Sequence, residues 1–210
     1  MGRFGTKGLK ILLLVLYPFL AVLVAPISFV GARSGLRGWH LFADPAHELG
    51  VLWGIFSNFG ILMWAAATAC CAIGWATLEK ASRLHPLHPW IVASAVLSAG
   101  LTVDDAFAIH EIVLARIPER IVLVAYALAI GWYLIRFRRE LFAREDSVIF
   151  VVSVSLLGSS FLVDMVSQPF RFSASIEELL KLFGIAAWLY FFFRVTLGLI
   201  TDLLSVREAR

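Results

Sequence analysis

Six apolar segments, each long enough to cross a bilayer as a helix, constrain this chain more than any other feature. They span about 11–31, 44–78, 90–115, 120–137, 147–168 and 175–203, and short polar loops separate them. A helix needs about 20 apolar residues to cross the hydrocarbon core, where backbone groups without partners are costly. The chain is 60% hydrophobic with a mean hydropathy of +0.87, which is more apolar than most soluble domains. The sequence therefore predicts an all-α integral membrane bundle of six transmembrane helices, with residues 1–210 in one domain.

The first segment also has features of a secretory signal. Arg3, Lys7 and Lys10 precede an apolar run, and Val30-Gly-Ala32 would fit a cleavage site. The run is long enough to span a bilayer, whereas the apolar region of a signal peptide is shorter. We therefore expect a retained first helix.

The distribution of basic residues predicts the orientation of the helices. With the N-terminus inside, eleven Lys and Arg residues lie in cytoplasmic segments and five lie in outer loops. Because cytoplasmic loops carry an excess of Lys and Arg, we expect both termini in the cytoplasm of a multi-pass protein, in the inner membrane of a bacterium. These basic residues lie in short loops between apolar segments, so we do not expect a nucleic-acid surface.

One stretch of the third segment, from Asp104 to Glu111, carries ionisable residues at a depth where they are costly. In the predicted orientation the third and fifth segments run outward, and the second and sixth run inward. Ionisable residues of all four segments therefore lie in the outer third of the bundle. They are Asp104, Asp105, His110, Glu111, His47, Asp164, Glu177, Glu178 and Lys181. Polar faces at one depth pack most simply against one another, which predicts a site there.

The acidic residues of this predicted site outnumber the basic ones. Six carboxylates and one lysine cannot all be ionised in a low dielectric unless cations or water are present. Carboxylate and imidazole ligands suit Zn, Mn or Fe, and helical bundles hold metals between facing helices. The predicted metal ligands are Asp104, His110, Glu111 and Asp164, with His47 and Asp105 beside them, and the predicted catalytic residues are Glu177, Glu178 and Lys181. Two alternatives to a metal are that some of the carboxyl groups are protonated and that water fills the site.

Three of these residues also have simpler interpretations. Ser175-Ile-Glu-Glu178 has the pattern of a capping box, in which Glu178 would help to cap the sixth helix. Glu177 and Lys181 have the spacing of an ion pair along one helix.

The sequence contains no HExxH motif and no nucleophile elbow. His85 and His88 could form a metal pair in the loop after the second helix, but a solvated loop is the simpler interpretation. Cys70 and Cys71 are adjacent in an apolar run, and adjacent cysteines rarely form a disulfide. We therefore base the predicted site on the acidic cluster.

Two motifs resemble those of a group of small bacterial multipass membrane proteins of unassigned function. They are Asp104-Asp105-x4-His110-Glu111 in the third segment and Glu177-Glu178-x2-Lys181-x2-Gly184 in the sixth. The resemblance covers roughly a quarter of the chain and implies that these residues act together. Membrane hydrolases of the alkaline ceramidase type carry a late His-x3-His pair. That pair is absent here, so their zinc site is not expected.

Three functions are compatible with an acidic cluster inside the membrane. The first is a metal-dependent enzyme, a hydrolase of a lipid or another amphiphile, with a site that opens outward. The second is a transporter coupled to protons or cations, but the inner half lacks a matching polar path and no inverted repeat occurs. The third is a non-catalytic subunit of a membrane complex. The sequence does not predict the oligomeric state.

Overall fold

The computed structural model describes residues 6–34, 41, 54–81, 85–107, 109, 119–166 and 171–208. Every regular element among them is a helix, so the predicted all-α class is confirmed. In chain order the elements are α1 (Thr6–Ile11), the π-helical η1 (Leu12–Leu16), α2 (Tyr17–Arg33), α3 (Ile55–Ala81), α4 (His88–Phe107), α5 (Glu119–Arg136), α6 (Arg138–Phe142), α7 (Ser147–Val166) and α8 (Arg171–Glu208).

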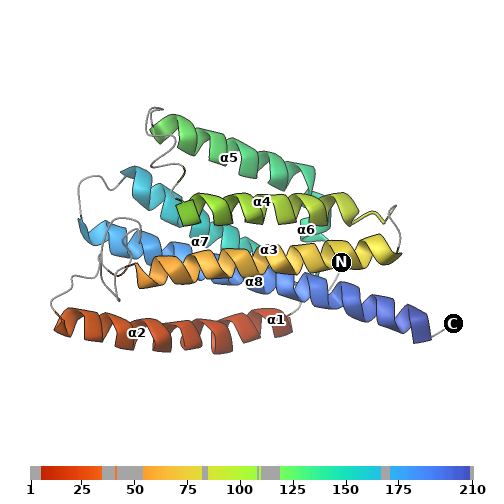
Figure 1. The fold of residues 1–210 in the computed structure, drawn as a ribbon, viewed down its shortest axis with the longest axis horizontal. Helices are drawn as coiled ribbons and strands as arrows, with labels where there is room; N and C mark the ends of the chain where they lie inside the picture. Colours follow the sequence, from red (N-terminus) through yellow and green to blue (C-terminus); the bar gives the residue numbers. More distant parts are fainter. Residues whose placement is uncertain are drawn as a thin grey trace.

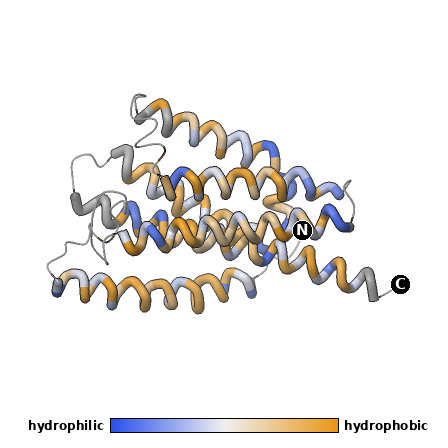
Figure 2. The backbone as a smooth tube through the Cα atoms, in the orientation of Figure 1, coloured by the Kyte–Doolittle hydropathy of each residue, from blue (hydrophilic) through white to orange (hydrophobic). Residues whose placement is uncertain are grey.

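The described part of each of the six apolar segments is helical, and the helices differ in length. Among the described residues, four helical stretches are long and apolar enough to cross a membrane: Lys7–Arg33, Ile55–Lys80, His88–Phe107 and Ile176–Ser205. α5 and α7 contain the shorter apolar stretches Val124–Arg136 and Ser147–Val163. In Figure 2, hydrophilic residues gather near the helix ends and apolar residues lie between them. This distribution is compatible with a multipass membrane protein.

The N-terminal helix begins earlier than predicted and contains a π-helical turn. Residues from Thr6 to Arg33 form α1, η1 and α2 in direct succession. Pro18 lies shortly after η1. In a regular α-helix, a proline has no N–H group to donate, and its ring clashes with the carbonyl group four residues before it. In η1 the backbone N–H of Tyr17 donates to the carbonyl of Leu12 instead, five residues back. The wider π-helical turn accommodates the proline within a continuous helix.

Two boundaries differ from the sequence prediction. α8 begins at Arg171, so Ser175 lies inside the helix and its interpretation as an N-cap is wrong. No Gly or Pro occurs between residues 171 and 183, so nothing in this stretch interrupts the helix. The basic loop after α5 contains the short helix α6, which the sequence analysis did not predict. Phe137 separates the two helices with φ −111° and ψ 19°.

α3, α4, α7 and α8 form the packed body of the bundle. Close backbone contacts join α7 to α8, and α3 to both α4 and α8. The rings of Phe150 and Trp188 lie 5.4 Å apart, and those of Trp188 and Phe192 lie 5.3 Å apart. Trp90 and Phe191 complete this aromatic core, and all five side chains are buried. Such rings bury large apolar areas and stabilise the contact between helices.

α2 and α5 lie at the periphery of this body (Figure 1). α5 stands away from α4, α7 and α8, and its closest described backbone contacts are with α6, which follows it. Both chain ends, the α3–α4 connection and α6 lie toward one end of the bundle (Figure 1). The end of α4 and the beginning of α8 lie toward the other end, so the acidic motifs of these two helices come to the same level.

Candidate functional site

The last turns of α4 hold Asp104 and Asp105, the two aspartates that the sequence analysis singled out. Asp104 is buried, with 7% of its surface exposed, and the Asp105 side chain is 13% exposed. Consecutive residues of a helix point about 100° apart, so the two carboxylates meet different neighbours. Both line a large cavity, and Asp105 also lines a small void of about 10 Å³ on its other side.

Lys181 of α8 forms an ion pair with Asp105 of α4. The Nζ atom donates to Oδ1 of Asp105 at 3.1 Å, and the lysine side chain is 33% exposed. The two helices run in opposite directions, so the end of α4 lies beside the beginning of α8 (Figure 1). The expected meeting of these two polar faces therefore occurs at this pair. The ammonium group also lies in the electrostatic field of Glu178 and Glu177, so Asp105 is one of three carboxylates that stabilise its charge.

A cavity of about 440 Å³ lies between α5 and the packed body of the bundle. This volume is within the range of pockets that hold small organic ligands. Most of the lining is apolar or aromatic. The lining residues are Trp64, Leu97, Leu101, Asp104, Asp105, Tyr126, Ala127, Ile130, Gly131, Leu134, Val154, Leu157, Gly158, Ser160, Phe161, Glu177, Lys181 and Trp188.

The cavity has a polar end and an apolar end. Asp104, Glu177 and Lys181 lie at the level where α4 ends and α8 begins. Seven residues earlier on α4 lies Leu97, and eleven residues later on α8 lies Trp188. At a rise of 1.5 Å per residue, the cavity extends about 10–16 Å along the helices. The arrangement fits an amphiphile, with a polar head beside the carboxylates and a tail along the apolar wall.

The structure distinguishes the two glutamates that begin the motif of α8. Glu177 lines the large cavity together with Lys181. Glu178 instead lines the small void, opposite Ser57 of α3. A void of this size is at the lower limit for one water molecule. Glu177 is therefore the glutamate that a ligand in the large cavity would meet.

Tyr126 and the Trp188–Ser98 pair belong to the surroundings of the site, and the sequence analysis did not assign them a role there. Tyr126 lines the cavity from α5, and its hydroxyl interacts electrostatically with Asp104. At the apolar end, Nε1 of Trp188 donates to Oγ of Ser98 at 3.0 Å, and the rings of Trp64 and Trp188 lie 5.8 Å apart. The signal that could have indicated Tyr126 is its position, since it is a polar side chain within an apolar segment at the level of the acidic residues.

Four of the predicted metal ligands have no described side chain. His47, His110 and Glu111 lie outside the described residues, and of Asp164 only its place in α7 is described. Within the described part of the chain, no group of three or more His, Cys, Asp or Glu side chains could hold a metal ion. The metal site therefore stays a prediction.

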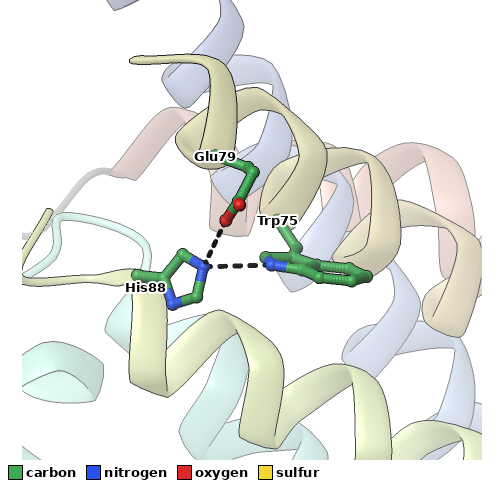
Figure 3. Close-up of polar contacts among 3 residues, drawn as sticks. All are labelled: Trp75, Glu79 and His88. Carbon is green, nitrogen blue, oxygen red and sulfur yellow. Dashed lines mark hydrogen bonds and ion pairs between the residues drawn. The ribbon is translucent and has the colours of Figure 1, made fainter. Parts of the chain in front are cut away.

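The two histidines near the α3–α4 connection have separate partners. Nε2 of His88 lies 3.0 Å from Nε1 of Trp75 and 3.1 Å from Oε2 of Glu79 (Figure 3). Nδ1 of His85 accepts a hydrogen bond from the backbone N–H of Leu87 at 3.2 Å. His88 is also the first residue of α4, so the loop is shorter than predicted. The contacts of His88 join α3 to α4 at the end of the bundle opposite the acidic site, whereas the hydrogen bond of His85 lies within the connection.

A protein-family model matches residues 11–195, and its description is Domain of unknown function (DUF8692). The matched range includes every described residue of the cavity and of the ion pair. Comparison with curated proteins and with solved structures found no match.

Proposed function

The chain belongs to the DUF8692 family, and we propose that it is a membrane-embedded enzyme that hydrolyses a lipid or another amphiphile. The observation that carries the proposal is the cavity of about 440 Å³, whose apolar wall leads to Asp104, Asp105, Glu177 and Lys181. A largely apolar pocket with a few converging polar groups is the usual form of a small-molecule site. Ionisable groups are rarely placed inside a membrane without a function.

The proposed topology has six spans and cytoplasmic termini. α5 and α7 would complete the bundle as shorter spans, which tilt or local thinning of the bilayer can accommodate. Lys80, Arg136 and Arg144 lie near the connections at the end that also holds both termini, and an excess of basic residues favours the cytoplasmic side. The polar end of the cavity would then face the outside of the cell membrane, in a bacterium the outer side of the inner membrane.

The proposed reaction adds one water molecule across an ester or amide bond. Glu177 would take a proton from water as the hydroxyl oxygen bonds to the carbonyl carbon, and would return that proton to the leaving oxygen or nitrogen as its bond to carbon breaks. Lys181 would stabilise negative charge on the former carbonyl oxygen, while Asp105 fixes the position of the ammonium group through the 3.1 Å ion pair. Each role belongs to a residue that lines the cavity.

A divalent metal, Zn, Fe or Mn, is the cofactor that we propose for this site. Asp104 is the described carboxylate that would bind it, because Asp105 is already paired with Lys181. Asp164, His110 and Glu111 would complete the ligand set, with His47 beside them. A bound metal of this kind polarises a carbonyl group or activates water at neutral pH.

The packing supports an enzyme over a transporter. A carrier needs a route through both halves of the bundle, whereas the cavity stops at Trp64 and Trp188. Beyond Trp188, the buried rings of Phe191 and Phe192 continue the aromatic core. A cavity with one polar end and one aromatic end is suited to holding a substrate.

Hydrolysis of a long-chain and a short-chain ester tests the proposal. Purified full-length protein in nanodiscs would be assayed with p-nitrophenyl dodecanoate and p-nitrophenyl acetate. We expect faster turnover of the dodecanoate and a loss of about 10²–10⁴-fold in Glu177→Gln. Glu79→Gln is the matched control, because Glu79 lies at the α3–α4 connection. Hydrolysis that Glu177→Gln leaves unchanged would overturn the proposed role of the site.

Elemental analysis of the same samples tests the metal. We expect Zn, Fe or Mn at a near-stoichiometric level in the wild-type protein and in Glu79→Gln, and its loss in Asp104→Asn. Wild-type protein without any of these metals at that level would overturn the metal-dependent form of the proposal.

A further inference from the structure

We propose that the occupant of the cavity is a single-chain amphiphile with an amine head, and that two glycines make room for its tail. This inference rests on the cavity of the proposed function and specifies the ligand that its carboxylates bind when no metal ion is held there. It follows from the charge at the polar end of the cavity, the extent of the apolar wall, and the open space beside Gly131 and Gly158.

The charge at the polar end favours a cationic head. The charged residues of the cavity lining are three carboxylates and one ammonium group: Asp104, Asp105, Glu177 and Lys181. Lys181 is ion-paired with Asp105 at 3.1 Å, so the lining has an excess of negative charge when its carboxyl groups are ionised and no metal ion is bound. An ammonium head would be attracted and could donate to carboxylate oxygens, whereas an anionic head would be repelled in a low dielectric.

The apolar wall favours a single tail. The cavity extends about 10–16 Å along the helices from the carboxylates to Trp188. α5 forms one wall and stands away from the packed body. Since the surrounding bilayer is itself apolar, an amphiphile could lie with its tail along α5 and its head at the acidic level.

Gly131 on α5 and Gly158 on α7 both line this cavity. A Cβ atom added at either position would meet no heavy atom within 4 Å. Glycine inside a helix is less favourable than alanine by about 1 kcal/mol, and packing against a neighbouring helix does not explain these two. A larger side chain at either position would project into open space beside the cavity and take the place of the tail.

The same observation supplies a matched control. Gly100 on α4 also has nothing within 4 Å of an added Cβ, yet it does not line the cavity. Gly100→Leu therefore adds the same side chain to open space at a position outside the cavity lining. The three leucine variants differ in whether the new side chain reaches the proposed tail.

Calorimetric titration of the full-length protein in zwitterionic nanodiscs tests the inference, with empty nanodiscs as the reference for partition. The probes are dodecylamine, dodecan-1-ol and dodecanoic acid, which share one tail and differ in the head. We expect saturable binding of the amine, tighter than that of the other two by about tenfold or more. We expect a similar loss of amine affinity in Gly131→Leu and Gly158→Leu, and wild-type affinity in Gly100→Leu.

The inference is overturned if the alcohol or the acid binds as tightly as the amine, or if both cavity variants retain wild-type affinity. The experiments distinguish a failure of this inference from a failure of the proposed hydrolase function. Amine binding that depends on Gly131 and Gly158, without hydrolysis of the dodecanoyl ester, would contradict the proposed hydrolase function and support the amine-headed ligand. Hydrolysis that depends on Glu177, without a preference for the amine, would do the reverse.

Discussion

Gly184 of α8 faces α7 at a point of close approach, and replacing it with alanine gives the sharpest test of the packing. A Cβ atom at this position would lie 2.8 Å from Cγ and 3.1 Å from the backbone nitrogen of Leu157. Oγ of Ser153 donates to the carbonyl oxygen of Gly184 at 2.8 Å. The backbone atoms of α7 cannot move without moving the helix, so Gly184→Ala would push α7 away from α8.

The magnitude follows from three contributions. Overpacking a filled interface costs about 1–3 kcal/mol, and weakening a hydrogen bond costs about 0.5–1.5 kcal/mol. Alanine is favoured over glycine within a helix by about 1 kcal/mol. The free energy of unfolding should therefore fall by about 0.5–3.5 kcal/mol. The same substitution at Gly198 of α8, where an added Cβ meets nothing within 4 Å, should instead raise it by about 1 kcal/mol.

Unfolding of the purified protein in mixed micelles by added dodecyl sulfate, followed by far-ultraviolet circular dichroism, measures both variants. The expected result is opposite signs for Gly184→Ala and Gly198→Ala. Leu157→Ala in the Gly184→Ala background should restore part of the loss, because it removes the nearest side-chain atom. If Gly184→Ala were as stable as Gly198→Ala, the close approach of α7 and α8 would not depend on glycine.

Two further predictions concern contacts outside the α7–α8 interface. Gly8→Ala should lower the free energy of unfolding by about 1–3 kcal/mol. The new methyl group would displace Asp146 and disturb its ion pair with Arg194, in which Nε and Oδ2 lie 2.7 Å apart. An unchanged free energy of unfolding would show that the N-terminal helix is not packed closely at Gly8. Trp188→Phe should cost about 1–3 kcal/mol by leaving the buried hydroxyl of Ser98 without its donor. Ser98→Ala in the same chain should then cost little more, as the same unfolding assay would show.

The helices could be predicted from the sequence because a bilayer sets a minimum length for an apolar segment. The described part of each of the six segments is helical, and the ends of the helices are less well predicted than their centres. Ser175 illustrates the reason. A Ser-x-x-Glu pattern begins a helix only if the preceding residues leave the helical conformation, and no glycine or proline ends the helix at that point.

That polar residues of α4 and α8 lie at the same level was predictable, because depth follows from helix direction and position along the chain; the pairing of Lys181 with Asp105 was not predicted. The rotation of each helix about its own axis was not. α8 carries apolar residues on all sides over most of its length, so its pattern does not indicate which face meets which neighbour. The assignment of Glu177 to the cavity and Glu178 to the small void depends on that rotation. It is fixed by close packing such as that between Gly184 and Leu157.

The charge of the cavity connects the two proposals for this protein. An ionised carboxylate inside a bilayer needs a compensating partner, and Lys181 provides one cation for the three carboxylates of the lining. A divalent metal and an ammonium head are two kinds of cation that the same carboxylates could bind. The substrate of a metal-dependent enzyme here would not need a cationic head, because the metal already balances the carboxylates. A preference for the amine therefore implies that the carboxylates bind the ligand directly, with Asp104 as a contact for the head in place of a metal ligand.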